Sequence, residues 1–384
     1  MRPRTLLPFL ATLLLPPLAA PARAADLPPV FVRSFGTFGS APGQLNWPRG
    51  VATGLGGGVY VADSGNDRLE KFMSGGPFLA AWGSYGTGPG QFKQMTGVAV
   101  SPGGDVYMSD WWNDRVQKWS AAGAFVAQVG APGTGNGQLK RPEGLALDAA
   151  GNVYVSDHDN HRIMKFNASG TYLGQWGGAG SAAGKFSGPS GIAIDANDVV
   201  YVSDSGNNRI QRFTTAGVSL GSWGSAGSAA GQFSNPYGLA LDGAQRVYVV
   251  DDWNNRVQVF TNTGAFITQW GGLGTGPGQF RSPEGIAIGP SGEIYVTDYQ
   301  NERVQMFVPA AAVPAMPGTT PWVMAFSLMG LGFLAVRQGG APEVASRSRS
   351  EGERALGTAI PAPSVHGSHF SPHPRSPSHI KRLC

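Results

Sequence analysis

The chain has 384 residues, a formal net charge of +4 and only 14% charged residues, so its surface must consist largely of uncharged polar residues and glycine. Its 58 glycines and 29 prolines favour many tight turns and argue against a fold of long helices. Because the positive excess gathers near the two ends of the chain, the body is not strongly basic, and we expect no nucleic-acid partner.

The N-terminus, residues 1–24, has the organisation of a signal peptide. Two arginines supply a positive start, residues 6–18 form a short apolar run broken by prolines, and residues 22–24 fit the small-x-small cleavage rule. An N-terminal membrane anchor is the alternative, but the short, interrupted run favours cleavage before Ala25. We therefore predict export to the periplasm or the cell surface. With Cys384 as its one cysteine, the exported chain would depend on core packing rather than on an internal disulfide.

The next part of the chain is an internal repeat. A tyrosine precedes each copy of a recurring aspartate by three positions, and an asparagine and an arginine follow it by three and five. The aspartates recur every 47 residues (63 to 110, and so on) as Asp63, Asp110, Asp157, Asp204, Asp251 and Asp298. A fixed period without insertions is typical of one supersecondary unit that is copied and packed against its neighbours.

Each unit predicts four short strands. Residues 97–130 contain four runs rich in Val, Tyr, Phe and Trp that are separated by Gly, Asn and Ser turns. Four antiparallel strands in a radially repeated unit form a propeller blade. In the first strand, alanine alternates with branched aliphatic residues, as expected where blades converge on a narrow axis.

The number of strands predicts how the ring closes. Six units supply the first three strands, whereas fourth strands follow only five of them, at 77–83, 124–130, 171–177, 218–224 and 265–271. Residues 30–36 supply the missing strand, because Phe35 stands one period before Trp82. We therefore predict an all-β fold over residues 25–308, a monomeric six-bladed β-propeller of four-stranded antiparallel blades. An N-terminal strand completes the last blade and leaves no exposed edge at the seam.

These motifs resemble those of the NHL-repeat family, a group of mostly six-bladed propellers. The resemblance covers about residues 30–308, and blade 5 carries its motifs as Gly231-Gln232-Phe233, Pro236-Tyr237-Gly238, Tyr248-Val249-Val250-Asp251, Asn255-Arg256-Val257-Gln258-Val259-Phe260 and Trp270-Gly271. Two departures are Met95 in place of proline and Val129 in place of tryptophan. The resemblance implies the architecture. It leaves the function open, because the family includes binding modules, RNA-binding domains, sensor ectodomains and enzymes.

The repeated Asp-x-x-Asn-x-Arg element is interpreted as structural, since six equivalent sites rarely form one catalytic centre. We expect its aspartate to accept backbone N–H bonds, its asparagine to adopt the left-handed conformation, and its arginine to bind a carboxylate or carbonyl of a neighbouring blade. The arginines are Arg68, Arg115, Arg162, Arg209, Arg256 and Arg303.

Positions that vary within the constant frame are the candidates for ligand binding. The turns between second and third strands and the residues before each first-strand glycine share one face, which we call the loop face. Exposed aromatic residues beside Arg, Asp and Glu are typical of surfaces that recognise a protein or a polysaccharide. Residues that merely suit a turn are the alternative. The candidates are Trp47, Arg49, Trp111, Trp112, Arg141, Glu143, His158, His161, Tyr237, Asp252, Trp253, Glu284 and Tyr299.

The sequence gives less support to an enzyme. Some members of the resembled family are metal-dependent lyases that bring histidines from several blades to the axis, whereas the body of this chain has only His158 and His161, both in blade 3. We expect no metal and no cofactor, and we expect the first strands to direct no His, Cys or Glu toward the axis. A lyase or lactonase with an axial site is the alternative function.

The C-terminal region predicts a membrane tether. A Pro/Ala linker at 309–320 precedes an apolar segment at 321–336 that ends at Arg337 and is similar to bacterial sorting signals. Sixteen residues would rise about 24 Å as a helix, which is short of the hydrocarbon core. A collapsed apolar tail is the alternative, and residues 337–384 depart from such signals by continuing as a Ser/Pro/Arg/His-rich segment that we expect to be disordered. Together these features predict an exported, membrane-tethered binding or scaffold module.

Overall fold

The computed structural model describes residues 26–54 and 56–310. The predicted signal peptide (1–24), apolar segment (321–336) and tail (337–384), with most of the linker (309–320), lie outside these residues. Within the described part of the chain, no helix is both long and apolar enough to cross a membrane.

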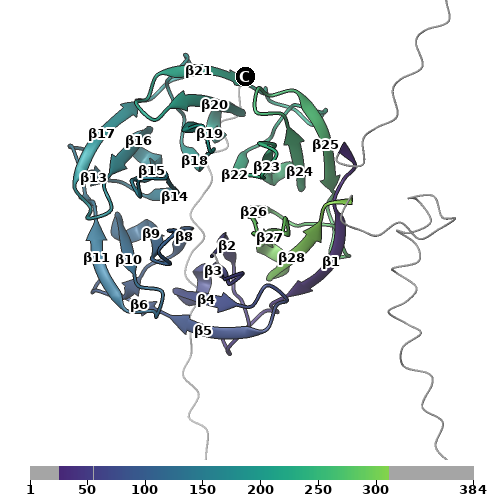
Figure 1. Ribbon diagram of the computed structural model, residues 1–384, viewed down its shortest axis with the longest axis horizontal. Helices are drawn as coiled ribbons and strands as arrows, with labels where there is room; N and C mark the ends of the chain where they lie inside the picture. Colours follow the sequence, from purple (N-terminus) through teal and green to yellow (C-terminus); the bar gives the residue numbers. More distant parts are fainter. Residues whose placement is uncertain (1–25, 55, 311–384) are drawn as a thin grey trace, which may run out of the picture. The chain divides into compact units, whose positions relative to one another are not determined.

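Six four-stranded antiparallel sheets surround a common axis as the blades of a propeller (Figure 1), which confirms the predicted fold class. Blade 1 contains β2 (Pro48–Thr53), β3 (Val59–Asp63), β4 (Arg68–Phe72) and β5 (Phe78–Trp82). Blade 2 contains β8 (Met95–Val100), β9 (Val106–Asp110), β10 (Arg115–Trp119) and β11 (Phe125–Val129). Blade 3 contains β14 (Pro142–Leu147), β15 (Val153–Asp157), β16 (Arg162–Phe166) and β17 (Tyr172–Gly177).

Blade 4 contains β18 (Pro189–Ile194), β19 (Val199–Asp204), β20 (Arg209–Thr214) and β21 (Ser219–Trp223). Blade 5 contains β22 (Pro236–Leu241), β23 (Val247–Asp251), β24 (Arg256–Phe260) and β25 (Phe266–Gly271). Blade 6 contains β26 (Pro283–Ile288), β27 (Ile294–Asp298), β28 (Arg303–Val308) and β1 (Val30–Phe35). Two connections between blades hold short parallel pairs, β6 (Ser84–Tyr85) with β7 (Gln91–Phe92) and β12 (Ala131–Pro132) with β13 (Gln138–Leu139).

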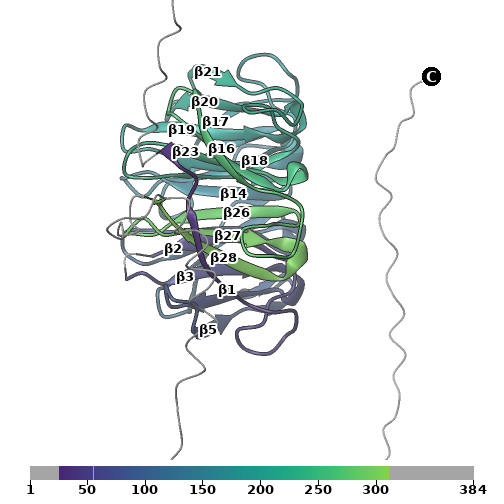
Figure 2. The same ribbon diagram turned by 90° about the vertical axis from the view of Figure 1, so that its right-hand side faces the viewer.

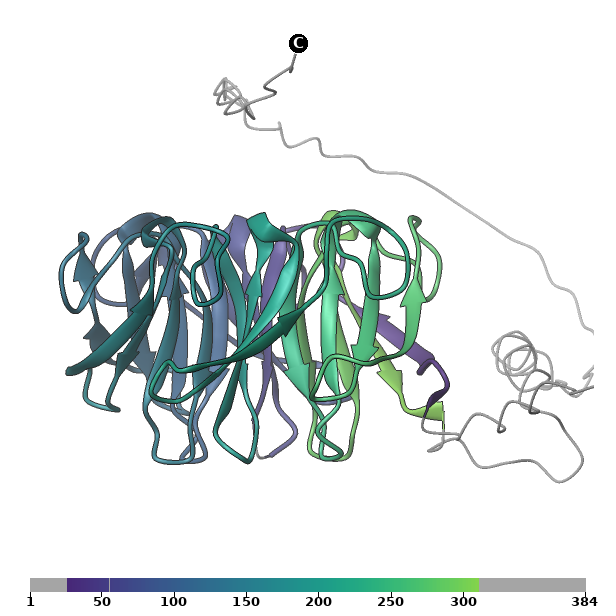
Figure 3. The same cartoon turned by 90° about the horizontal axis from the view of Figure 1, so that it is seen from above.

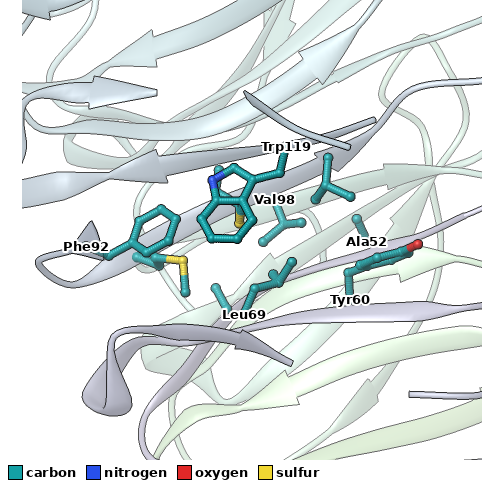
Figure 4. Close-up of a cluster of buried hydrophobic side chains, with 10 residues drawn as sticks. Ala52, Tyr60, Leu69, Phe92, Val98 and Trp119 are labelled. Carbon is teal, nitrogen blue, oxygen red and sulfur yellow. The ribbon is translucent and has the colours of Figure 1, made fainter. Parts of the chain in front are cut away.

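The core lies between neighbouring blades. Every residue of β3 is buried, because one face of this strand packs against blade 6 and the other packs against blade 2. Figure 4 shows this packing between blades 1 and 2, where Tyr60 and Leu69 of one blade meet Val98 and Trp119 of the next. The ring therefore has no single core but six equivalent clusters, one at each contact between blades.

The N-terminal strand closes the ring as predicted. Strand β1 runs antiparallel to β28, with Val30 opposite Val308 and Phe35 opposite Val304, and Figure 2 shows the two strands side by side. The Phe35 ring also lies 4.9 Å from that of Phe72 in blade 1, so the same strand packs on the next blade. The seam thus joins residues far apart in the sequence by strand pairing and by aromatic packing.

The Asp-x-x-Asn-x-Arg element has a structural role in every blade. In blade 3, Asp157 accepts hydrogen bonds from the Lys140 backbone N–H at 2.6 Å, Asn160 Nδ2 at 2.8 Å and Arg162 Nε at 2.7 Å. One detail of the prediction is wrong, because the left-handed residue is the one after the asparagine, His161 with φ 54° in blade 3. The Nε of Arg162 binds the aspartate of its own blade, and its Nη atoms donate to the carbonyl oxygens of Thr134, Gly135 and Gln138 in the connection from blade 2, as expected for a carbonyl partner.

That left-handed residue fastens each blade to the next, a contact that we call the inter-blade clip. Its side chain accepts a hydrogen bond from the backbone N–H of the residue 27 positions later, where the following blade begins. At the seam, Glu302 Oε2 accepts from the Trp47 N–H at 2.5 Å. The acceptors are Asp67, Asp114, His161, Asn208, Asn255 and Glu302.

Candidate functional site

The loop face combines the turns between second and third strands with the starts of the inner strands. Each turn is a single 3-10 turn, and Pro142 at the start of β14 lies opposite Asp157 at the end of β15, so the two features share one end of the blade. Figure 3 shows the ring edge-on, with strands running between its two faces. The six turns are η2 (Ser64–Asn66), η3 (Trp111–Asn113), η4 (His158–Asn160), η5 (Ser205–Asn207), η6 (Asp252–Asn254) and η7 (Tyr299–Asn301).

Six glycines bring the blade backbones close together at the axis. A Cβ on Gly144 would lie 2.2 Å from the Ser190 carbonyl oxygen of the next blade, and one on Gly285 would lie 2.3 Å from the Arg49 carbonyl oxygen across the seam. Real Cβ atoms do not approach so closely, so glycine is required there for the backbones to meet. The residue before each glycine is thereby held beside the axis.

These preceding residues line a small cavity on the axis, which we call the axial pocket. Its volume is about 70 Å³, and six branched aliphatic side chains form its apolar part. The polar residues around it are Arg49, Thr96, Glu143, Ser190, Tyr237 and Glu284, one from each blade. The expectation that first strands direct no glutamate toward the axis is therefore wrong, because Glu143 and Glu284 lie within β14 and β26 and both line the pocket.

The polar residues of the pocket contact one another across the axis. Tyr237 of blade 5 donates its hydroxyl hydrogen to Glu143 Oε1 of blade 3, and Arg49 Nη1 of blade 1 donates to the Tyr237 hydroxyl oxygen at 3.3 Å. Arg49 Nε lies 3.5 Å from Glu284 Oε2 as an ion pair without hydrogen-bond alignment. The Arg49 guanidinium also lies 5.3 Å from the centre of the Tyr299 ring.

Burial dominates the electrostatics of the pocket. It raises the pKa of Glu284 to about 8, although Arg49 acts in the opposite direction. Burial likewise raises the pKa of Glu143, against the charges of His158 and Arg49, and that of Asp252 to about 6. Burial acts to lower the pKa of Arg49, but Glu284 and its other anionic neighbours raise it overall, so Arg49 remains charged.

His158 extends the cluster toward blade 2. Its Nδ1 lies 2.9 Å from Asp159 Oδ1, its Nε2 lies 3.9 Å from Glu143 Oε2, and its ring centre lies 5.2 Å from that of Trp111. A carboxylate accepts hydrogen bonds, so the contact with Asp159 places a hydrogen on Nδ1, whereas Nε2 is too far from Glu143 for a hydrogen bond.

Aromatic side chains border the pocket at the surface. Trp47 is 50% exposed and stacks on Tyr299 with ring centres 6.1 Å apart. Trp112 is 53% exposed, and the Arg141 guanidinium covers it at 4.5 Å from the ring centre. Trp253 is 70% exposed in blade 5. Exposed indoles and the Arg141 guanidinium therefore lie together at the rim of the axial pocket.

The inter-blade clips help to position this rim. The N–H groups that they bind belong to residues held in the left-handed conformation, which include Trp47 with φ 53° and Arg141 with φ 50°. Such backbone is unfavourable for non-glycine residues and persists where surrounding bonds impose it. Trp47 and Arg141 are thus held in place by the frame.

The structure sorts the thirteen sequence candidates into three groups. Arg49, Glu143, Tyr237 and Glu284 meet at the axis, and His161 Nδ1 accepts the Gly188 N–H at 3.0 Å in a clip. The other eight lie in or beside the turns of the loop face, and among them Asp252 is buried close to Glu284. The sequence search missed the clips, although side chains able to accept hydrogen bonds recur at those six positions with the same spacing as the aspartates. Within residues 26–54 and 56–310, no group of three or more His, Cys, Asp or Glu residues is placed to hold a metal ion.

Comparisons with known proteins agree with the repeat and the fold. Residues 139–166 and 186–213 match the family model of the NHL repeat, and residues 237–307 match a model described as a 6-bladed beta-propeller. No curated protein matches the chain in sequence.

Solved structures of several different proteins share the fold. A streptogramin B lyase is 16% identical with a TM-score of 0.53, over 71% of this chain and 96% of the lyase. A gluconolactonase from Xanthomonas campestris is 14% identical with a TM-score of 0.54, over 76% of this chain and 99% of that one. A protein of unknown function from Bacteroides thetaiotaomicron is 17% identical with a TM-score of 0.56, over 73% of each chain. At such identities the similarity extends to the architecture alone.

Proposed function

We propose that this chain is an exported binding module whose loop face recognises a protein or a polysaccharide of the cell envelope. One observation carries the proposal: three indoles on the loop face, each at least half exposed, surround a buried polar pocket. They belong to Trp47, Trp112 and Trp253. Exposed aromatic residues cost free energy in water and stabilise a complex when a partner covers them. The constant Asp-x-x-Asn-x-Arg frame holds this variable face rigidly.

A binding screen tests this function. Envelope polysaccharides and envelope proteins would be titrated against the purified full-length chain, and any ligand found would be tested on Trp112→Ala and Trp253→Ala. If these indoles contact the ligand, each change should weaken binding by about 30-fold, the effect of losing about 2 kcal/mol at an interface hot spot. Met73→Ala is the matched control, because Met73 is 51% exposed and follows β4 at the opposite end of blade 1. Equal effects of all three changes would contradict the assignment of the loop face.

Export and tethering are part of the same proposal. They rest on the signal-like organisation of residues 1–24 and on the apolar segment 321–336. Cell fractionation tests them, and we expect the full-length chain in the membrane fraction of the envelope. Recovery of the whole chain from the soluble fraction would contradict the tether.

An enzyme is the second candidate function, favoured by the cluster of Glu143, Tyr237, Arg49 and Glu284 on the axis. Buried carboxylates with raised pKa values are suited to general acid–base chemistry. Because a gluconolactonase and a streptogramin B lyase share the architecture, a lactone and a streptogramin are suitable first substrates to test. Turnover that Glu284→Gln abolishes would favour the enzyme over the binding module.

A further inference from the structure

The axial pocket contains a carboxylate whose hydrogen bonds are incomplete. The Glu143 side chain is 5% exposed, and its Oε1 accepts from Tyr237. The Ser190 hydroxyl lies near enough to lower the pKa of Glu143, but it makes no aligned hydrogen bond, and Oε2 has no hydrogen-bond partner. His158 is the nearest basic group to Oε2, but its Nε2 lies 3.9 Å away, which is too far for a hydrogen bond. A buried acceptor without a donor is costly, and a ligand that supplies the donor would remove that cost.

The charges in the pocket are also unequal. Its charged lining residues are Arg49, Glu143 and Glu284, so one cation faces two carboxylates once Glu284 has lost its proton. A third carboxylate, Asp252, lies close enough to affect Glu284 and has a buried Oδ1 without a hydrogen-bond partner. An additional positive group at this position would complete the pairing.

The shape of the pocket restricts what can supply that group. A volume of about 70 Å³ has room for a small polar head and a water molecule or two. A neutral sugar could donate hydrogen bonds there, but it would not supply a positive charge. Above it, the aromatic rim formed by Trp47, Tyr299 and Trp111 offers apolar surface to a slender aliphatic stem.

We propose that the axial pocket binds the ammonium group of a lysine side chain presented by a partner protein. The ammonium donates to Glu143 Oε2 and offsets the charge of Glu284, and the four methylene groups of the stem lie against the rim. This inference rests on the proposed binding function and selects a protein from its two classes of ligand. Lysine suits the site because its charge is compact and its stem is narrow.

The proposal predicts that affinity depends on pH. The groups that face Glu284 are Arg49, Asp252, Glu143 and Tyr299, and burial raises the pKa of Glu284 to about 8. Below that pH a proton neutralises Glu284, and the ammonium must displace it. Because about a tenth of Glu284 is ionised at pH 7 and about nine-tenths at pH 9, affinity should rise about tenfold over this interval.

The test uses the full-length chain and three small probes observed through its indole NMR signals. The probes are acetyl-Gly-Lys-Gly-amide, the same peptide with norleucine, and a glucosamine tetramer as an amine on a saccharide. We expect only the lysine peptide to bind, about tenfold more tightly at pH 9 than at pH 7. Glu143→Gln should weaken binding at least tenfold, and Glu284→Gln should remove the pH dependence. Glu293→Gln, in the β26–β27 turn at the other face, is the matched control and should change neither.

Several results would overturn the lysine assignment. The first is that the norleucine peptide binds as tightly as the lysine peptide, and the second is that the glucosamine tetramer binds more tightly than the lysine peptide. The third is that the lysine peptide does not bind to the unmutated chain, although this chain unfolds at its normal Tm. If the envelope screen still finds a ligand that depends on Trp112 and Trp253, the binding function stands and only this inference falls. Thermal melts of Glu143→Gln and Glu284→Gln show whether a loss of binding reflects unfolding. If Glu284→Gln is folded and its affinity for the lysine peptide still rises tenfold from pH 7 to pH 9, the assignment is wrong.

Discussion

Glu70 provides a sharp test of the frame, because it replaces a glutamine found at the same position in four other blades. In blade 2, Gln117 Oε1 accepts the Gly90 N–H at 3.0 Å, and its Nε2 donates to the Gln91 carbonyl oxygen at 2.7 Å and to Asp110. Glu70 Oε1 accepts the Gly43 N–H at 3.2 Å, but its buried Oε2 has no hydrogen-bond partner. Glu70→Gln should restore the missing donor and stabilise the ring.

The size of the effect follows from the pKa of the carboxyl group. Burial raises the pKa of Glu70 from 4.5 to about 7, although Arg68 and the Gly43 N–H lower it. The folded state therefore binds the proton more tightly than the unfolded state. The associated stability is complete below pH 4.5 and is lost as pH rises through 7. This loss is about 3 kcal/mol at 1.36 kcal/mol per pH unit.

The glutamine variant avoids this loss. Arg68 Nη2 lies 2.8 Å from Glu70 Oε1, and its attraction is already included in the pKa of about 7. The net gain should therefore be about 3 kcal/mol at pH 9 and close to zero at pH 5. In a ring of this size that corresponds to an increase in Tm of about 5 °C at pH 9.

Thermal unfolding of the full-length chain at pH 5 and pH 9 measures the difference. Gln258→Glu is the matched reverse change, because Gln258 accepts the Gly231 N–H and donates to Gln232 and Asp251 in blade 5. It should lower the Tm at pH 9 more than at pH 5. A gain from Glu70→Gln that is as large at pH 5 as at pH 9, or a loss at pH 9, would refute the reasoning.

Two further predictions concern the frame. Asp157→Ala should cost about 3–5 kcal/mol of stability and lower the Tm, because it leaves buried Arg162 without its carboxylate. Asp105→Ala is the control, since it removes a more exposed partner of Lys118 and should have little effect on the Tm; equal Tm values for the two variants would contradict the structural role. Deletion of residues 26–36 should lower the Tm and cause self-association detectable by light scattering, because β28 becomes an exposed edge, and a monomer with an unchanged Tm would show that β1 does not close the ring.

The sequence was sufficient for the architecture because the repeat has no insertions. The spacing of 47 residues between Asp63 and Asp110 fixes equivalent positions in all blades, and counting strands places residues 30–36 beside the last blade. The structure confirms both inferences, with Val30 paired to Val308. Each rests on a regularity in the chain itself, so neither required knowledge of how side chains meet in space.

The axial pocket could not be predicted in the same way, because a local irregularity decides which side chains face the axis. Each inner strand begins two residues before its glycine, and the pairing shifts register between Pro142 and Leu145 in blade 3. Glu143 lies within this bulge and lines the axial pocket, whereas the sequence analysis placed it on the loop face without an axial contact. The same shift occurs between Pro283 and Ile286, where it brings Glu284 into the pocket.

His161 shows why variation within a constant frame does not by itself identify a binding residue. It is the only histidine among the six clip positions, and its difference from Asp114 and Asn208 marks it as a candidate in the sequence. All three side chains nevertheless make the same contact, since each accepts a hydrogen bond from one backbone N–H of the next blade. Glu143 differs from His161 in a physical sense, because one of its buried oxygens has no hydrogen-bond partner. Glu70 also has a buried oxygen without a partner, but it does not line the axial pocket. Unused bonding capacity inside the pocket, rather than residue type, is therefore the property that distinguishes a candidate ligand-binding residue from a structural one in this ring.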